Sequence, residues 1–326
     1  NNGSDRSITG VGFQPDLVWN KNRSASANHN LWNGVTGITQ RLTSSGTQAS
    51  ENYSSEFKSF DSDGVTITQN AGSLDINNSS YNYVNWNWLG ANGTASNSNG
   101  SITSTVSANT TAGFSIVSYT GTGSNATVGH GLGVAPAFAI VKDRGNTVSW
   151  VVSGDNIGWN KNVYLDSTQA VQTANHFQDT APTSSLMYLS TDAAVNGSSR
   201  NYIMYCFAEK KGFSKFGSYT GNGNADGTYL HLGFRPAFFL CKDTANSNDW
   251  VMFDNKRDSH NVVAEYLRPN LSNAANSGTN YMDFTSNGIK HRANDTWTNG
   301  SGRNYIYMAF AENPFTSSTG TPVTAR

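Results

Sequence analysis

The feature that most constrains the fold of this chain is a decapeptide that occurs three times. Its copies are GFQPDLVWNK at residues 12–21, GVAPAFAIVK at 133–142 and GFRPAFFLCK at 233–242. Internal repetition determines the architecture of a chain before any shorter motif is considered. The Pro of each copy suits the start of a strand, where no ladder hydrogen bond is lost, and the apolar side chains after it alternate. The sequence therefore predicts three equivalent strands, one in each of three repeated units.

Further matches give the length of the repeated unit. Three similar aromatic segments close the units: NYVNWNWLG from Asn82, NYIMYCFAE from Asn201 and NYIYMAFAE from Asn304. The predicted organisation is repeat 1 at 1–92, a Ser/Thr/Asn-rich linker or added polar strand at 93–112, repeat 2 at 113–212, repeat 3 at 213–315 and a polar C-terminal tail at 316–326. Trp150 and Trp250 take equal positions in repeats 2 and 3, and Trp32 is interpreted as their displaced equivalent.

The distribution of residue types predicts an all-β fold. Short runs rich in Val, Ile, Phe, Tyr and Trp alternate with clusters of Gly, Asn, Ser and Asp, and no segment has a helical period. We expect three tandem antiparallel β-sandwich units of about 100 residues, a size typical of jelly-roll or immunoglobulin-like sandwiches. Alternation along the closing strands puts one set of large side chains in the core of each sandwich and leaves the other set permissive. The predicted core set is Val84, Trp86, Trp88, Ile203, Tyr205, Phe207, Ile306, Met308 and Phe310.

One strand of repeat 1 is absent from the sequence as numbered. Repeats 2 and 3 begin with GFSIVSYTG and GFSKFGSYTG, whereas repeat 1 begins at Asn1, already past this point. A bare sheet edge invites pairing with another chain. Residues upstream of Asn1 are the simpler source of the strand, and the tail of a neighbouring chain, SSTGTPVTAR from Ser317, is the other.

Composition and motifs argue against several classes of function. A net charge of −1 gives no electrostatic footprint for nucleic acid, and no apolar run reaches the roughly 18 residues of a membrane span. Cys206 and Cys241 have no metal or redox spacing and are expected as packed free thiols. We find no phosphate-binding, dinucleotide or nucleophile motif and expect neither a cofactor nor an enzyme. Two dispersed carboxylates would still suffice for a glycosidase.

Several ionisable residues are candidates for chemistry, each with a structural alternative. The Lys that ends each decapeptide, at 21, 142 and 242, is expected at the rim of a sandwich, where Glu209 and Glu312 are candidate partners in exposed ion pairs. Asp61 and Asp63, in FDSDG, form a weak candidate calcium site. A plain turn in which the carboxylates accept backbone N–H bonds is the favoured interpretation.

Two tryptophans are the candidate ligand-binding residues. Trp159 and Trp297 stand among turn-forming residues and have no counterpart in the other repeats. An aromatic face on a polar loop suits stacking against a sugar ring or a partner surface. Anchoring of the local loop is the alternative that we favour for both.

The amino-acid sequences of several segments resemble those of a known group of proteins. The strings FDSDG, AGFSIVSYTGTGSNATVGHGLG and MAFAENPF resemble repeat domains of virion proteins of marine tailed bacteriophages, which are described as fibre-like, appendage or structural components. The resemblance covers nearly the whole chain, although the FDSDG equivalent of repeat 2 is blurred. It implies a β-sandwich fold and an extracellular structural or adhesive role at the virion surface, but no active site.

The resemblance also implies partners: other virion proteins, further copies of the chain, and host cell-surface glycan. Two alternatives remain open. One is a capsid-decorating or filament-forming subunit that binds only protein. The other is a glycan-binding module or glycan-active enzyme of a secreted protein.

Overall fold

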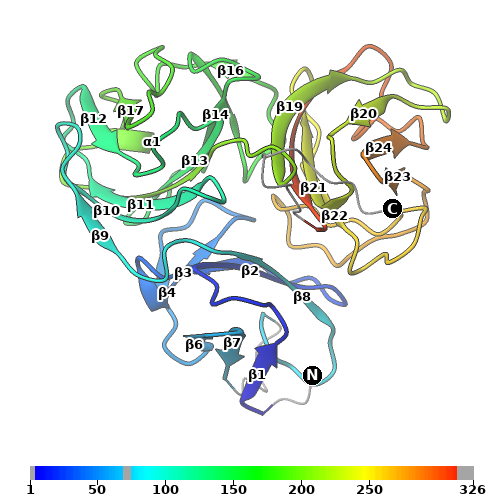
Figure 1. Ribbon diagram of the computed structural model, residues 1–326, viewed down its shortest axis with the longest axis horizontal. Helices are drawn as coiled ribbons and strands as arrows, with labels where there is room; N and C mark the ends of the chain where they lie inside the picture. Colours follow the sequence, from blue (N-terminus) through cyan, green and yellow to red (C-terminus); the bar gives the residue numbers. More distant parts are fainter. Residues whose placement is uncertain (1–3, 69–74, 314–326) are drawn as a thin grey trace.

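The computed structural model describes residues 4–68 and 75–313 as an all-β protein with three lobes (Figure 1). All the pairs of neighbouring strands in its sheets are antiparallel. The single helix among the described residues, α1, is the short segment Ala193–Asn196. This part of the chain has no helix long and apolar enough to cross a membrane. The all-β, antiparallel prediction is confirmed, and the predicted tail at 316–326 lies outside the described residues.

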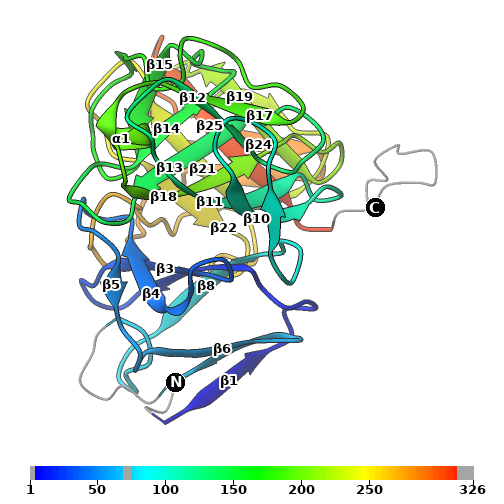
Figure 2. The same cartoon turned by 90° about the vertical axis from the view of Figure 1, so that its left-hand side faces the viewer.

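Lobe 1 contains a five-stranded and a three-stranded sheet. The larger has the order β5 (Glu51–Asn52), β4 (Gly37–Thr43), β3 (His29–Asn33), β2 (Leu17–Asn22) and β8 (Tyr83–Trp88). The smaller has the order β1 (Arg6–Thr9), β7 (Gly64–Ile67) and β6 (Phe57–Asp61). Figure 2 shows the small sheet below the large one, away from the other lobes.

Lobe 2 contains an eight-stranded sheet and a strand pair. The sheet has the order β16 (Gln172–Thr173), β15 (Lys161–Tyr164), β14 (Val151–Gly154), β13 (Phe138–Asp143), β18 (Asn201–Phe207), β11 (Phe114–Thr120), β10 (Ser104–Asn109) and β9 (Ala95–Asn97). The pair joins β12 (Ala126–Gly129) and β17 (Leu186–Leu189). The polar stretch 93–112 thus contains β9 and β10, which extend this sheet.

Lobe 3 contains a four-stranded and a three-stranded sheet. The larger has the order β19 (Ser214–Thr220), β25 (Asn304–Ala311), β21 (Pro236–Asp243) and β22 (Val251–Asp254). The smaller has the order β20 (Tyr229–His231), β24 (Gly288–His291) and β23 (Met282–Thr285).

The three decapeptides form strands with equivalent partners. In every lobe the decapeptide strand (β2, β13 or β21) pairs with the closing strand (β8, β18 or β25). The register is the same in all three, because the facing pairs are Leu17 with Trp88, Phe138 with Phe207 and Phe238 with Phe310. Equal registers place equivalent side chains on equivalent faces. The repeated sequence is therefore a repeated strand pairing.

The predicted core face of the closing strands packs against the other lobes as well as its own. One cluster of buried side chains joins the three large sheets and includes Trp88, Phe207 and Phe310. The ring of Phe310 lies 5.9 Å from that of Trp88 and 6.1 Å from that of Phe207, centre to centre. We call this cluster the aromatic hub. The prediction of burial was right for Trp86 and Trp88 and for the members from the other two lobes, but Val84 is only partly buried.

The face of each large sheet that points away from the hub covers a second, separate cluster within its own lobe. In lobe 2 this cluster contains Met204 and Cys206, and in lobe 3 it contains Tyr307 and Ala309. The expectation of a permissive second face is therefore wrong in these lobes, because both faces of the sheet are buried. Both cysteines are buried free thiols, as predicted.

Candidate functional site

Equivalent aromatic positions hold the lobes together around the hub. The indole N–H of Trp150 donates to the carbonyl oxygen of Thr43 at 3.0 Å, and that of Trp250 donates to the carbonyl oxygen of Tyr164 at 2.8 Å. Lobe 2 therefore contacts lobe 1, and lobe 3 contacts lobe 2. Head-to-tail contacts of this kind close into a ring when the rotation between units allows it.

In lobe 1 the position of Trp150 and Trp250 is taken by His29. His29, Trp150 and Trp250 are equivalent, because each lies two residues before the residue that faces the same position of its decapeptide strand. These facing pairs are Leu31 with Trp19, Val152 with Ile140 and Met252 with Leu240. His29 is completely buried, and its Nδ1 accepts a hydrogen bond from the indole N–H of Trp19 at 3.0 Å. Lobe 1 contacts lobe 3 beside it through Lys21, which donates to the carbonyl oxygen of Ser272 at 3.2 Å. The interpretation of Trp32 as the displaced tryptophan is wrong, because Trp32 stacks on Phe57 inside lobe 1.

Backbone contacts between the loops repeat the same cyclic order. The amide of Ala275 donates to the carbonyl oxygen of Arg23 at 2.9 Å, which joins lobe 3 to lobe 1. The equivalent bonds run from Ser50 to Arg144 and from Val171 to Thr244, both at 2.8 Å. Backbone bonds of this kind fix the relative positions of the three lobes.

The three repeated lysines are buried and not at an exposed rim, and Lys21 and Lys142 bond across the junctions. All three side chains are fully buried. The ammonium of Lys21 donates to the carbonyl oxygens of Asn22 and Ser272, at 2.6 and 3.2 Å. That of Lys142 donates to Thr47 of lobe 1 at 2.8 Å, and that of Lys242 donates to the carbonyl oxygen of Asp243 at 2.6 Å. The lysines bind backbone carbonyl groups because these are the acceptors left where the strands end.

Burial changes the acid–base properties of these lysines. Loss of hydration lowers the pKa of Lys21, of Lys142 and of Lys242 to about 8, since burial disfavours the charged form. The neighbouring carboxylates act in the opposite direction but are weaker. A lowered lysine pKa also occurs at catalytic sites. Here the Nζ atoms are occupied by loop carbonyl groups, which favours a structural role.

The glutamates expected beside the lysines have other partners. Glu312 forms an ion pair with Arg235 at 2.9 Å and accepts a hydrogen bond from the Asn255 amide at 2.7 Å. Glu209 is exposed, and its carboxylate accepts from the backbone N–H of Phe216 at 3.5 Å. The expected Lys–Glu pairs are therefore wrong, because the lysines are buried and bond to backbone carbonyl groups.

Asp61 and Asp63 do not share a ligand position. Asp63 accepts hydrogen bonds from the amides of Gly10 and Gly12 at 3.0 and 2.6 Å, which lower its carboxyl pKa. Asp61 accepts from the hydroxyl groups of Ser59 and Thr66, both at 2.6 Å. Within 4–68 and 75–313 no group of three or more His, Cys, Asp or Glu residues suits a metal ion. Asp63 thus accepts backbone N–H bonds, as in the alternative favoured from the sequence, but the donors lie in the loop after β1 and not in its own turn.

Trp159 is an internal anchor of its loop. It is 5% exposed and packs edge-on against Phe177, with the ring centres 5.5 Å apart. Its indole N–H donates to the Asp155 carboxylate at 2.8 Å. The buried ring offers no free face on which a ligand could stack. For Trp159, therefore, the structure favours anchoring of the local loop over ligand binding.

Trp297 stands in a mixed aromatic and cationic corner of lobe 3. The guanidinium carbon of Arg268 lies 4.2 Å from the centre of the Trp297 ring and 5.2 Å from that of Tyr266. Arg268 also donates to the Tyr266 hydroxyl at 3.0 Å and pairs with the Asp249 carboxylate at 3.4 Å. Cation–π contacts of this kind hold a guanidinium flat on an aromatic face. We call Tyr266, Arg268 and Trp297 the aromatic corner.

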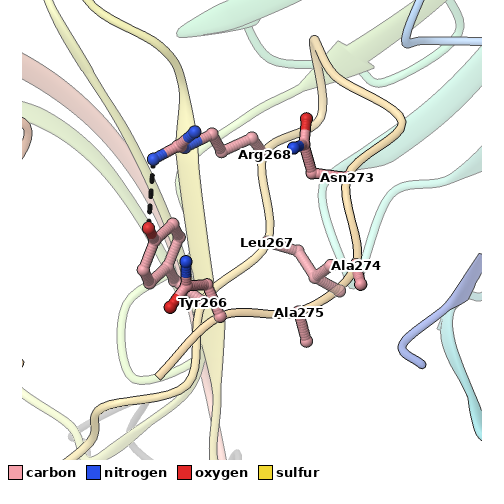
Figure 3. A pocket seen from close by; sticks show the side chains of 7 residues that line it. Tyr266, Leu267, Arg268, Asn273, Ala274 and Ala275 are labelled. Atoms are coloured by element: carbon pink, nitrogen blue, oxygen red, sulfur yellow. Dashed lines mark hydrogen bonds between the residues drawn. The ribbon is translucent and has the colours of Figure 1, made fainter. Parts of the chain in front are cut away.

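A cavity of about 230 Å³ adjoins the aromatic corner. Figure 3 shows Tyr266 and Arg268 on one side of it and Asn273 and Ala274 on the other. The wall contains a guanidinium, a phenol and amide groups beside small apolar side chains. Convergent polar groups on a partly apolar surface are typical of small-ligand sites. Sequence reasoning missed Tyr266 and Arg268, since YLRPN belongs to no motif and only the fold brings it to Trp297.

The fold and these contacts define an all-β protein with three lobes around an aromatic hub, whose repeated lysines are buried and bond to backbone carbonyl groups. A family model described as a domain of unknown function (DUF7483) matches residues 1–314, and the chain belongs to that family. No curated protein and no solved structure matches this chain.

Proposed function

We propose that this chain is an extracellular structural and adhesive protein of a virion surface, which presents polar loops to host-cell surface glycan. The observation that carries the structural part is the ring of junctions. Lobes 1 and 2, 2 and 3, and 3 and 1 are each joined by buried side chains and backbone bonds. A scaffold closed in this way holds its loops in fixed positions, as an attachment or surface component requires.

The resemblance of the motifs to virion repeat domains supports the location, and the surface composition supports a polar ligand. Among the described residues, the exposed large hydrophobic side chains are Val134 and Tyr229, which lie in different lobes. Large apolar patches mark docking sites for protein or membrane. Two separate side chains make no such patch.

We also propose that the lobes are three tandem β-sandwiches that arose from one repeated unit of about 100 residues. Equal strand registers in the three large sheets support this. So does the equivalence of the small sheets, since β1, β12 and β20 each precede the decapeptide strand of their lobe. The proposed boundaries are 1–92, 113–212 and 213–315.

The aromatic corner is the proposed glycan contact. Trp297 and Tyr266 provide the aromatic surface on which a sugar ring stacks, and Arg268 donates hydrogen bonds to its hydroxyl or carboxylate groups. One face of Trp297 is already covered by Arg268, so the ligand would contact the guanidinium and the rim of the rings. This geometry favours an acidic glycan, whose carboxylate can replace the 3.4 Å contact of Arg268 with Asp249.

The test is binding of the full chain to a glycan array that includes acidic and neutral oligosaccharides. We expect retention on acidic glycans, with a loss of about tenfold or more for Arg268→Gln and for Trp297→Ala, since one charged hydrogen bond contributes roughly 1.5–3 kcal/mol. Tyr229→Ala is the matched control, because it removes an exposed aromatic side chain of β20 that does not belong to the aromatic corner. Equal binding by all three variants would contradict the proposed corner.

A subunit that binds only protein is the second candidate function. Among the described residues β8 is the last strand of its sheet, which favours this candidate, because sheet edges are common sites of strand addition. Absence of binding to every glycan, together with immunogold labelling of virions by an antibody against the chain, would favour this candidate. Labelling of no particle would contradict both.

A further inference from the structure

The cavity beside the aromatic corner lies within one loop of lobe 3. Its lining residues all belong to the segment 266–276. The backbone groups of Tyr266 and Asn276 exchange two hydrogen bonds, at 2.9 and 3.1 Å, and close the neck of this loop. Figure 3 shows Arg268 on one arm of the loop and Asn273 on the other. The conformation of the loop therefore sets the width of the cavity.

The far arm of the loop is attached to lobe 1 at two points. At the first, the carbonyl oxygen of Ser272 accepts hydrogen bonds from the N–H of Ala27 at 2.8 Å and from the ammonium of Lys21 at 3.2 Å. At the second, the N–H of Ala275 donates to the carbonyl oxygen of Arg23 at 2.9 Å. The other wall residues of this arm lie between the two attachments. Lobe 1 therefore fixes the position of the far arm.

The near arm is attached to the same residue of lobe 1. Glu265 directly precedes the loop, and its carboxylate accepts three hydrogen bonds from the guanidinium of Arg23, at 3.0, 2.8 and 2.7 Å. Both carboxylate oxygens take part, which fixes the relative orientation of the two side chains. Arg23 thus holds the near arm through its side chain and the far arm through its carbonyl group. Neither Arg23 nor Glu265 lines the cavity.

This ion pair is particular to the junction beside the cavity. Arg23 lies two residues after its decapeptide, and Glu265 lies two residues before Leu267, which pairs with Met252. The equivalent positions hold Gln40 and Arg144 at the lobe 1–2 junction, and Lys161 and Thr244 at the lobe 2–3 junction. Each of these pairs contains a neutral side chain. The other junctions thus form without such an ion pair, and its place beside the cavity suits a role in shaping the loop.

We propose that lobe 1 sets the ligand-binding shape of the cavity in lobe 3, and that Arg23 is the positioning residue through which it does so. This inference rests on the proposed function, in which the aromatic corner takes an acidic glycan. A ligand between Arg268 and Asn273 contacts both arms, so its affinity depends on the distance between them. Arms that are held in advance need not be ordered on binding, which favours affinity. By reciprocity, a bound ligand strengthens the attachment of the loop to lobe 1.

The affinity test uses the full chain with two acidic probes, methyl glucuronide and the acidic oligosaccharide retained most strongly on the array, and with methyl glucoside as the neutral probe. Arg23→Ala should weaken binding of the acidic probes about threefold to fivefold, the most that a partly exposed ion pair contributes. Glu265→Gln keeps the shape of the side chain and should have the same effect. Arg235→Ala is the matched control, because Arg235 forms a partly exposed pair with Glu312 at 2.9 Å and does not line the cavity.

Amide exchange tests the positioning role apart from affinity. In the free chain, the amides of Tyr266 and Asn276 should exchange about threefold faster or more in Arg23→Ala than in Arg235→Ala, because the neck of the loop has lost a support. In the parent chain, either acidic probe should slow exchange of the Ala27 amide, which bonds to the loop but does not line the cavity. Methyl glucoside should not.

The outcomes separate this inference from the proposed function. If the parent chain binds neither methyl glucuronide nor any acidic glycan of the array, the proposed function fails and this inference fails with it. If the parent chain binds an acidic probe and Arg23→Ala and Glu265→Gln bind it equally well, only the positioning role is overturned. Equal weakening by Arg235→Ala, or unchanged exchange at Tyr266 and Asn276 in Arg23→Ala, would also overturn it.

Discussion

The indole N–H of Trp150 and the carbonyl oxygen of Thr43 lie 3.0 Å apart, and these residues are separated by 107 positions in the chain. Their hydrogen bond joins lobe 2 to lobe 1 at a buried point. Trp250 repeats it between lobes 3 and 2, and Lys21 bonds to the carbonyl oxygen of Ser272 between lobes 1 and 3. The lobes therefore depend on one another for the burial of equivalent groups. We expect this chain to unfold as one cooperative unit and not lobe by lobe.

Replacement of Trp150 tests this dependence. Trp150→Phe removes the donor and leaves the Thr43 carbonyl buried without it, which costs about 1–3 kcal/mol. The distinctive result is faster amide exchange in β4 of lobe 1, although the substitution is in lobe 2. Trp159→Phe is the matched control, because its indole bonds to Asp155 within lobe 2. Unchanged exchange in β4 for Trp150→Phe would show that the junction contributes little.

The aromatic hub gives a second prediction. Phe310→Ala removes the ring that contacts both Trp88 and Phe207 and should lower the free energy of unfolding by about 3–5 kcal/mol. Phe207→Ala and Trp88→Ala should have effects of similar size. Denaturant unfolding followed by tryptophan fluorescence would measure them.

Asn85→Ala is the control for the hub, since its side chain lies on the opposite face of β8 and accepts one hydrogen bond from Asn20. We expect a loss of at most about 1.5 kcal/mol. Two separate transitions in Phe310→Ala, with lobes 1 and 2 intact, would contradict a shared hub.

Much of the fold could be predicted from the sequence because it depends on local alternation. The decapeptide and closing strands, their equivalence and the burial of Trp88, Phe207 and Phe310 follow from a period of two residues and a repeated register. Alternation alone does not reveal what covers a sheet face. The same apolar stripe fits the core of one sandwich or a hub shared by three, and only the path of the whole chain distinguishes them.

The lysines show the same limit at the level of single residues. Their position after the apolar residues of the decapeptide strand predicts that they lie at the end of a sheet. Whether that end is exposed to solvent depends on the neighbouring lobe. Thr47 of lobe 1 covers Lys142, and Ser272 of lobe 3 approaches Lys21. The aromatic corner could not be predicted from the sequence for a related reason, because Arg268 and Trp297 come together only through tertiary folding.

Acid should destabilise the protein partly through His291. Burial lowers the pKa of this side chain to about 3, so between pH 6.5 and 3 the unfolded chain binds a proton that the folded chain does not. Stability is therefore lost as the pH falls through this range. His291→Phe, which keeps the stacking on Tyr219, should be less sensitive to acid than the parent protein. Equal slopes of stability against pH for the two proteins would contradict this role.

The buried lysines give a prediction of the same sign at alkaline pH. Each has a folded-state pKa of about 8, against 10.5 for an ordinary lysine. Between these values the unfolded chain binds more protons than the folded chain, so the free energy of unfolding should rise as the pH increases from about 8 towards 10. Above about 10 the trend should reverse, because burial raises the pKa of Tyr202 to about 12 and the unfolded tyrosines ionise first.

Lys142→Met isolates the contribution of one lysine to this rise. It removes the titrating group but keeps an apolar stem of similar length, so the slope between pH 8 and 10 should fall by about a third if the three sites act independently. Lys58→Met, at an exposed ion pair with Asp5, is the control and should leave the slope unchanged. Urea midpoints measured at half-unit steps of pH give both slopes. A flat profile for the parent protein between pH 8 and 10 would show that the ammonium groups are stabilised by the loop carbonyls as fully as by water.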